Sequence, residues 1–270
     1  MDQFLTFFEQ MPVWQKAGWI FLVLAVFWLL EGHYALRNLA YNKWKHARTN
    51  LVFLAFVMAI NVAFGILTAG VFVWLGTSDF GLLHLFEAPV WLELLLSVLV
   101  LDLIAQYTVH VLLHKVAVFW RLHLIHHSDT KVDATTGTRH HPLDFILRES
   151  FALLAVVLMG MPISFYLFYR ILSVFFTYFT HANIQLGDKV DTAISWVFVS
   201  PNMHKIHHHD TMPITDTNYG NMFSIWDRMF GTFIKIDQDK IVYGIDSVKD
   251  VSDASIKSQL LLPFTYKKQR

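Results

Sequence analysis

The 270-residue chain contains no cysteine. This absence excludes disulfide bonds, cysteine-ligated iron–sulfur clusters, thiolate-ligated haem and zinc ribbons. Charged residues are scarce as well: they make up 16% of the sequence, whereas a soluble domain usually contains about 25%. The formal net charge is zero, so we expect no basic surface for nucleic acid. The sequence also lacks a glycine-rich dinucleotide-binding run and a phosphate-binding loop, and it therefore predicts no nucleotide site.

Apolar residues and histidines are, in contrast, abundant. Hydrophobic residues make up 55% of the chain, 24 residues are phenylalanine, and the mean hydropathy is +0.43. Such a composition is typical of a protein that lies in a membrane. The 15 histidines approach the 21 acidic residues in number, and a membrane location gives no reason for them. We therefore expect the histidines to carry the chemistry.

Four apolar runs predict helices, at Ala17–Leu30, Leu51–Leu75, Ala88–Leu113 and Phe151–Phe179. We interpret the first three as spanning helices. The second and third runs are long enough to cross the hydrocarbon core of a bilayer, and the first lacks the basic start and small-residue cleavage site of a signal peptide, so we expect it to be a retained helix. The segment Gly160-Met161-Pro162 interrupts the fourth run. Two short helices hinged there would return the chain to the side from which it came. Only then can histidines before and after this run share one site.

Basic residues are distributed unevenly between the connections. The connection between the first two runs carries Arg37, Lys43, Lys45 and Arg48. The connection between the second and third runs carries Asp79 and Glu87 but no lysine or arginine. The positive-inside rule therefore places the first connection, and with it the histidine clusters, in the cytoplasm. We expect a multi-pass protein of a bacterial inner membrane or of the endoplasmic reticulum.

The predicted fold is all-α. It is an integral membrane helical bundle of three spanning helices plus a short helical hairpin, with a cytoplasmic helical cap that carries the histidine clusters. We divide the chain into N-terminal transmembrane helices (1–90), a histidine-rich catalytic domain (91–235) and a cytoplasmic C-terminal tail (236–270). The membrane hairpin falls at about 150–181, within the second of these parts.

Three histidine clusters share a helical spacing. They are His110-x3-His114, His123-x2-His126-His127 and His204-x2-His207-His208. Residues at positions i, i+3 and i+4 lie on one face of a helix, so each cluster presents its imidazoles in one direction. Neutral imidazole binds Fe, Zn, Cu and Ni. Eight convergent ligands exceed the four that one zinc ion needs, so we predict a centre of two metal ions.

The remaining histidines receive individual predictions. His181 ends the fourth apolar run, where the chain returns toward the clusters, and we expect it to be a further metal ligand. Of the neighbours His140 and His141, we expect His141 to line the site. His209 faces away from its cluster and is predicted not to be a ligand. The others have no partner at ligand spacing and are predicted to be surface or interface residues: His33, His46 and His84.

Outer residues that orient the ligands are expected nearby, because a ligating imidazole usually donates its second N–H to a carboxylate or carbonyl. Asp102, Gln106, His110 and His114 form a polar stripe on an apolar helix. Asp102 lies about 12 Å above His110 on helix geometry, so we expect it to act through Gln106, Tyr107 or water. The candidates for this outer role are Asp102, Tyr107 and Asp227, with Asp129, Asp133 and Asp210 also near the clusters in sequence.

The order and spacing of the clusters resemble those of the fatty acid hydroxylase/sterol desaturase superfamily. The sequence motifs that flank the clusters match as well: Arg139-His140-His141-Pro142, His181-Ala182-Asn183, Asn218-Tyr219-Gly220 and Trp226-Asp227-Arg228 through Thr232. The resemblance covers roughly residues 95–235. The first 90 residues match only as hydrophobic spans.

This resemblance implies a membrane-bound di-iron oxygenase. Two Fe ions would be held by the eight cluster histidines and His181, and zinc can replace iron in isolated proteins of this kind. The implied reaction uses O2 and two electrons to hydroxylate or desaturate a fatty acyl, sterol-like or ether lipid. The chain has no cysteine and no sequence motif for binding flavin or haem. A separate electron donor, such as a reductase, a ferredoxin or a cytochrome b5-like protein, is therefore expected.

Two other classes of function stay open at this stage. A histidine-rich membrane protein can transport zinc, but a transporter places its ligands near the membrane midplane, and two of the three clusters fall outside the apolar runs. A metal-stabilised scaffold without activity is the other alternative. A metalloprotease is disfavoured because the sequence contains no His-Glu-x-x-His motif.

Overall fold

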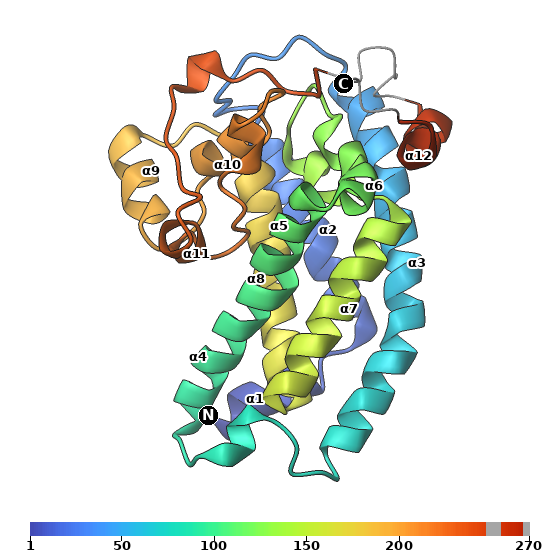
Figure 1. Cartoon of the computed structure of the whole chain (residues 1–270), viewed down its shortest axis with the longest axis vertical. Helices are drawn as coiled ribbons and strands as arrows, with labels where there is room; N and C mark the ends of the chain where they lie inside the picture. Colours follow the sequence, from blue (N-terminus) through green and yellow to red (C-terminus); the bar gives the residue numbers. More distant parts are fainter. Residues whose placement is uncertain (247–254, 267–270) are drawn as a thin grey trace.

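The computed structural model describes residues 1–246 and 255–266, and Figure 1 shows that its regular structure is helical. The main helices are α1 (Asp2–Glu9), α2 (Val13–Leu30), α3 (Lys43–Leu75), α4 (Val90–Leu101), α5 (Val109–Lys115), α6 (Ala117–His127), α7 (Pro142–Met159), α8 (Ile163–His181), α9 (Asp188–Ser195), α10 (Pro201–His207), α11 (Ile225–Met229) and α12 (Ile256–Thr265). The described residues form isolated β-bridges but no strand. The predicted all-α class is confirmed.

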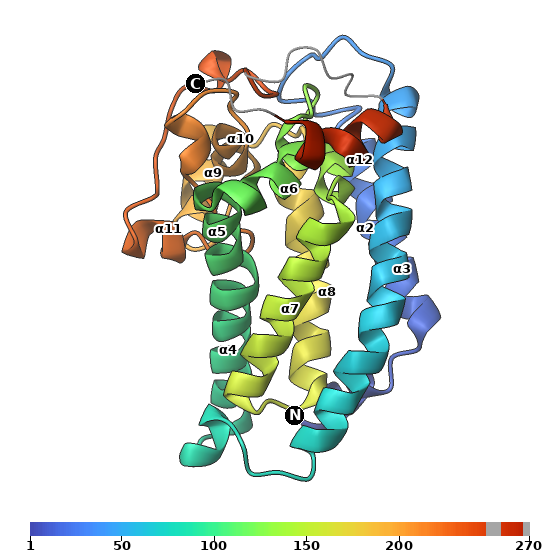
Figure 2. The ribbon, with the colours of Figure 1, turned by 45° about the vertical axis from the view of Figure 1, so that its right-hand side comes forward.

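The long helices form one bundle. Figure 2 shows α4, α7, α8 and α3 running along the long axis, with α2 beside them. Four helical segments are long and apolar enough to cross a membrane: Val13–Leu30, Lys43–Leu75, Val90–Lys115 and Ile163–His181. Large apolar side chains on α3 face outward, and Val62 and Ile66 are 73% and 79% exposed. Such surfaces suit contact with lipid, so the prediction of an integral membrane bundle is confirmed.

The predicted hairpin is formed by α7 and α8. The first arm ends at Gly160, which has the left-handed φ of 66° that favours glycine, and the second arm begins after Pro162. The arms are longer than expected from the sequence, with 18 and 19 residues. Arg170 on α8 pairs with Glu149 on α7, with 2.5 Å between Nη1 and Oε1, so the two charges neutralise each other between the helices.

The third span is not a regular α-helix throughout. Residues Asp102–Thr108 between α4 and α5 form a π-helix. A π-helix has a wider turn than an α-helix and occurs frequently at functional sites. This segment carries Asp102, Gln106 and Tyr107, which belong to the predicted polar stripe or to the predicted outer residues.

A cap of shorter elements covers one end of the bundle. Figure 1 shows α6, α10 and α12 at the same end, and α9 and α11 at its side. The described part of the predicted tail 236–270 is not free, because α12 packs on α6 and Ser128 Oγ donates to Gln259 Oε1 at 2.9 Å. The parts of this tail at 247–254 and 267–270 lie outside the described residues.

Candidate metal centre

Nine buried histidines meet at the capped end of the bundle. They come from α5, from α6, from the last residue of α8, and from α10 with the residue that follows it. They form two groups, and within each group one ring nitrogen per residue lies within 4.8 Å of all the others. The five-histidine group contains His110, His114, His123, His127 and His207, and the four-histidine group contains His126, His181, His204 and His208. The structure thus brings together the eight cluster histidines and His181.

The local structure explains why the clusters converge. A single extended residue, Val116 with ψ 115°, separates α5 from α6 and turns the chain between them. This turn sets His110 opposite His123 and His114 opposite His127. The third cluster lies on α10, where Ser200 caps the helix by accepting a hydrogen bond from the Met203 amide at 3.2 Å.

The ring nitrogens of the five-histidine group favour a bound cation. His110 Nδ1 donates to the carbonyl of Tyr219 at 2.7 Å, and His123 Nδ1 donates to Asp144 Oδ2 at 2.9 Å. In each neutral ring the proton is then on Nδ1, so Nε2 presents a lone pair. The two Nε2 atoms lie 3.0 Å apart. Two lone pairs at this distance repel each other unless a positive ion lies between them, so the donor set fits a metal.

The other rings of this group are oriented in a similar way. His114 Nδ1 lies 3.3 Å from Asp216 Oδ1, and its Nε2 lies 3.1 Å from His127 Nε2. His207 Nδ1 donates to the carbonyl of Thr217 at 2.8 Å. Four of the five imidazoles therefore have a hydrogen-bond acceptor behind the ring and a free nitrogen in front.

The four-histidine group is centred on His181. Its Nδ1 donates to the carbonyl of Thr177 at 2.6 Å. Its Nε2 lies 3.1 Å from His126 Nε2 and 3.0 Å from His204 Nε2. The ring of His208 completes the group, with its centre 4.7 Å from that of His126. Three Nε2 atoms thus face one another, an arrangement that could hold a metal ion.

Burial keeps these imidazoles in the form that binds metals. It lowers the pKa of His123 to about 3 and the pKa of His126 and His127 well below the ordinary histidine range. The neighbouring imidazoles lower the pKa further at His126 and His127. At neutral pH these rings are uncharged, and uncharged imidazole is the ligand form.

Asp102 has a different role from the predicted one. Its Oδ2 accepts hydrogen bonds from Trp226 Nε1 at 2.9 Å and from the Phe223 amide at 3.2 Å. Gln106, one of the three routes by which Asp102 was expected to reach the histidines, donates instead to Ser173 Oγ at 3.4 Å. The route through Gln106 is therefore wrong, because the carboxylate binds Trp226 in α11 and Phe223 in the loop before it. Asp102 anchors α11 and this loop.

Asp227 and Tyr107 lie on a path that ends at His110. Tyr107 Oη donates to Thr232 Oγ1 at 2.9 Å, and Thr232 Oγ1 donates to Asp227 Oδ1 at 2.7 Å. The same carboxylate accepts from the backbone amide of Tyr219 at 2.8 Å. The carbonyl of Tyr219 in turn accepts from His110. Asp227 thus holds the peptide segment that orients one imidazole.

Three neighbouring histidines lie outside both groups. His141 caps α7 and accepts a hydrogen bond from the Leu143 amide at 3.1 Å, because Pro142 starts the helix directly after it. It was expected to line the site, whereas its neighbour His140 does so, with its ring stacked on that of His126 at 4.6 Å. His209 accepts from the Val242 amide at 3.0 Å and is in neither group, in line with its prediction as a non-ligand.

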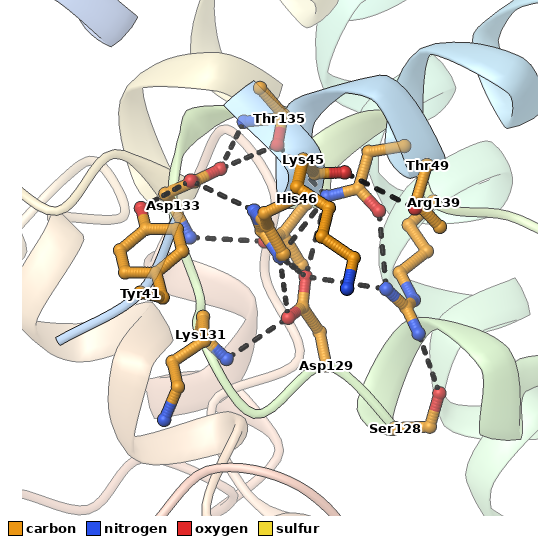
Figure 3. A network of polar contacts seen from close by, with 12 residues as sticks. Tyr41, Lys45, His46, Thr49, Ser128, Asp129, Lys131, Asp133, Thr135 and Arg139 are labelled. Atoms are coloured by element: carbon orange, nitrogen blue, oxygen red, sulfur yellow. Dashed lines mark hydrogen bonds and ion pairs between the residues drawn. The ribbon is translucent and has the colours of Figure 1, made fainter. Parts of the chain in front are cut away.

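His46 was predicted to be a surface or interface residue, and this was wrong. Figure 3 shows it inside a buried polar network that joins α3 to the loop after α6. Its Nε2 lies 2.8 Å from Asp129 Oδ1, and its Nδ1 lies 3.0 Å from Asp133 Oδ2. Burial alone would raise the pKa of Asp129, but His46 and buried Arg139 hold that pKa well below its ordinary value. Asp129 and Asp133 therefore fix this loop and orient no histidine of the two groups.

The residues behind the ligands were mostly missed by the sequence analysis. Within the described residues, the carboxylates of Asp144 and Asp216 hydrogen-bond to group histidines, and neither stands at a diagnostic spacing from a cluster. The partners of His110 and His207 are backbone carbonyls. Backbone carbonyls belong to every residue type, so no sequence signal marks them.

A cavity of about 140 Å³ extends from the histidines into the bundle. Its walls come from α2, α3, α7, α8 and the π-helical segment, and they include His126, His181 and His204. Gln106, Ser173, Thr177 and Asn221 form a polar strip on one wall by hydrogen-bonding to one another. The volume suits a segment of a ligand rather than a whole drug-sized molecule, for which pockets are usually about 300 Å³ or larger.

The fold and site define a class: a helical membrane protein with two groups of buried histidines that could hold metal ions, beside a cavity in its helical bundle. The sequence model of the fatty acid hydroxylase family matches residues 94–232, and the chain belongs to this family. The matched part contains all nine histidines of the two groups.

Known relatives share part of the chain. The chain is 28% identical over 127 residues to the ornithine lipid hydroxylase OlsE of Rhizobium tropici. This aligned segment covers 47% of this chain and 38% of that protein. It is 30% identical over 161 residues to the alkylglycerol monooxygenase of Caenorhabditis elegans, over 58% of this chain and 30% of the relative. The Homo sapiens alkylglycerol monooxygenase is 26% identical over 183 residues, which are 66% of this chain and 38% of the relative. Each match therefore spans less than half of the relative. No solved structure matches the chain significantly.

Proposed function

We propose that this protein is a membrane-bound di-iron oxygenase that hydroxylates a lipid. The observation that carries the proposal is the pair of histidine groups beside the cavity, with Nε2 atoms that face one another at 3.0–3.1 Å. The names of the relatives, a lipid hydroxylase and monooxygenases of an ether lipid, favour hydroxylation over desaturation. The substrate class we propose is a lipid with a polar headgroup and a long hydrocarbon chain.

Two iron ions would be held by the nine histidines, and they would supply the activation of O2 that breaks an unactivated C–H bond. The chain itself supplies orientation. Asp144, Asp216 and the carbonyls behind the rings fix the tautomers and aim the free nitrogens inward. The walls of the cavity hold a segment of the lipid next to His126, His181 and His204 and keep bulk water away.

The two electrons must come from outside the chain, and we propose a separate reductase, ferredoxin or cytochrome b5-like donor. The donor would dock at the capped end, where the metal groups lie. We further propose that this end faces the cytoplasm. The basic residues Lys43, Lys45 and Arg48 lie at the start of α3 on the capped side, whereas the connection after α3 carries Asp79 and Glu87.

The proposal is tested with the purified full chain in detergent, loaded with Fe²⁺ and supplied with a chemical reductant and 18O2. The probes are an alkylglycerol and an amino-acid-containing lipid, with products identified by mass spectrometry. We expect about two irons per chain and incorporation of one labelled oxygen atom into the product. The variant His123→Ala should lose the product, and the matched variant His33→Ala, at an exposed histidine, should keep it.

Other outcomes would point elsewhere. Zinc uptake into vesicles that contain the protein, without oxidation of any lipid, would replace the oxygenase by a transporter. A preparation that holds only one ion when fully loaded would also contradict the proposed centre.

A further inference from the structure

The two histidine groups differ in what lies behind their rings. In the five-histidine group, four of the five Nδ1 atoms have a partner: a carbonyl oxygen behind His110 and His207, and a carboxylate behind His114 and His123. Only Nδ1 of His127 has none among the residues that the structure describes. This group thus combines more imidazoles with two negatively charged neighbours.

In the four-histidine group, a single ring is supported. His181 donates to a carbonyl, whereas Nδ1 of His126, His204 and His208 finds no partner within the described part of the chain. Asp129 influences His208 electrostatically, but its carboxylate is committed to His46, Thr136 and the Lys131 amide, as Figure 3 shows in part. No carboxylate hydrogen-bonds to a ring of this group in the described residues.

Such partners matter for affinity. A hydrogen bond from Nδ1–H to an acceptor fixes the tautomer, orients the ring and makes Nε2 a better donor, and its loss typically lowers metal affinity by about 10- to 100-fold. The carboxylates Asp144 and Asp216 also place negative charge next to the cation. A metal in the four-histidine group has one imidazole fewer and lacks most of this support.

The two groups also differ in their contact with the cavity, which is lined by more rings of the four-histidine group. Its walls include three of the four rings of the four-histidine group, His126, His181 and His204. Of the five-histidine group, only His110 reaches the cavity. An ion with fewer protein ligands has more coordination positions to offer to a substrate or to O2.

We infer that the two metal sites are unequal: the five-histidine group is the tight site that retains its ion, and the four-histidine group is the weak, exchangeable site that faces the substrate. This inference rests on the dinuclear centre proposed above. It assigns different tasks to adjacent residues, because His207 serves the tight site and His208 serves the weak one.

Zn²⁺ binding to the metal-free full chain in detergent tests the inference without any turnover. A chromophoric chelator competes for the ion, and the metal content is measured after each stepwise addition. We expect two classes of site, with dissociation constants that differ by at least about tenfold. Dialysis against the chelator should remove the weakly bound ion first and leave one ion per chain.

The variants His207→Ala and His208→Ala form a matched pair that locates the two classes. His208→Ala should keep one ion at the tight wild-type affinity, and His207→Ala should weaken the tight class. Equal losses in the two variants, or two classes within threefold of each other in the wild type, would overturn the inference and leave the dinuclear centre standing. Absence of a second ion would overturn both proposals. If a variant does not fold, the wild-type measurement alone decides whether the affinities differ.

Discussion

Asp144 lies in the first turn of α7, and its carboxylate accepts hydrogen bonds from His123 and from Arg148 Nε, each at 2.9 Å. Replacing it by asparagine keeps the shape but removes the charge that stabilises the Nδ1–H tautomer of His123. We expect Asp144→Asn to lower the affinity of one of the two ions by about 10- to 100-fold. Zn²⁺ competition with a chelator measures this loss.

The matched control for this change is Asp210→Asn. Asp210 also neighbours a histidine, but that residue is His209, which lies in neither group, and the two side chains are 3.7 Å apart. We expect wild-type affinity for both ions in this variant. An equal effect of both substitutions would show that net charge, and not the orientation of His123, controls metal binding.

The histidines that converge in the structure could be predicted from the sequence, whereas their division into two groups could not. The spacing of His123, His126 and His127 encodes one helical face, so convergence follows from local geometry. Adjacent His126 and His127 nevertheless belong to different groups. This division depends on which rings from α5, α8 and α10 lie opposite, and such contacts join positions far apart in the chain.

At the scale of elements, the turn between α7 and α8 depends on Gly160. This residue has φ 66°, and a Cβ atom placed there would lie 2.1 Å from the carbonyl oxygen of Phe80. Because neither the backbone nor the neighbouring loop can give way easily, we expect Gly160→Ala to destabilise the protein by about 1–3 kcal/mol or more. Thermal unfolding in detergent measures the change.

Gly18 provides the control, since it lies inside α2 with nothing within 4 Å of an added Cβ. Gly18→Ala should be neutral or stabilising by up to about 1 kcal/mol, because alanine favours the helix. If both variants unfold at the wild-type temperature, the turn tolerates a side chain and the close contact with Phe80 is not important for stability.

The same hairpin contains a buried ion pair, and we expect the effect of replacing one of its residues on stability to depend on the presence of the other. Arg170 Nη1 lies 2.5 Å from Glu149 Oε1, and Arg170 Nη2 donates to Asn61 Oδ1 at 3.1 Å. Arg170→Met would leave the buried Glu149 without its partner, and we expect a loss of about 3–5 kcal/mol. The double variant Arg170→Met/Glu149→Met should recover most of it. Equal unfolding temperatures for the single and double variants would contradict this dependence.

Some structural elements could be predicted from the sequence and others could not, for physical reasons. The hinge of the hairpin was predictable because glycine and proline restrict the backbone locally. The π-helix at Asp102–Thr108 was not, since its apolar sequence fits an α-helix equally well. The burial of His46 was also missed, because its partners Asp129 and Asp133 lie more than 80 positions further along the chain.

At the scale of the whole molecule, we expect the buried imidazoles to make the metal-free protein sensitive to acid. Burial lowers the pKa of six group histidines outside the spanning helices: His123, His126, His127, His204, His207 and His208. Below the unfolded pKa of about 6.5 the unfolded chain binds more protons than the folded chain. Stability should therefore be full above about pH 7 and fall as the pH decreases through the unfolded pKa, with each such imidazole adding to the fall.

Thermal unfolding of the metal-free protein between pH 8 and pH 5.5 measures this dependence. Bound metal should raise the unfolding temperature most at the higher pH, because protons compete with the ion for the same nitrogens. An unfolding temperature that is independent of pH in this range would mean that the imidazoles are accessible to water in the metal-free protein.

The orientation in the membrane can be tested directly because the chain has no cysteine. A single cysteine is introduced by Thr77→Cys, at an exposed position after α3, or by Asp239→Cys, at an exposed position on the capped side. Since the basic residues lie at the capped end, we expect a membrane-impermeant maleimide to label the first variant in spheroplasts of a bacterial expression host. The second should be labelled only after permeabilisation, and both should react fully in detergent. The reverse pattern would place the metal groups on the side away from cytoplasmic reductants, and the electrons would then need a donor outside the cytoplasm.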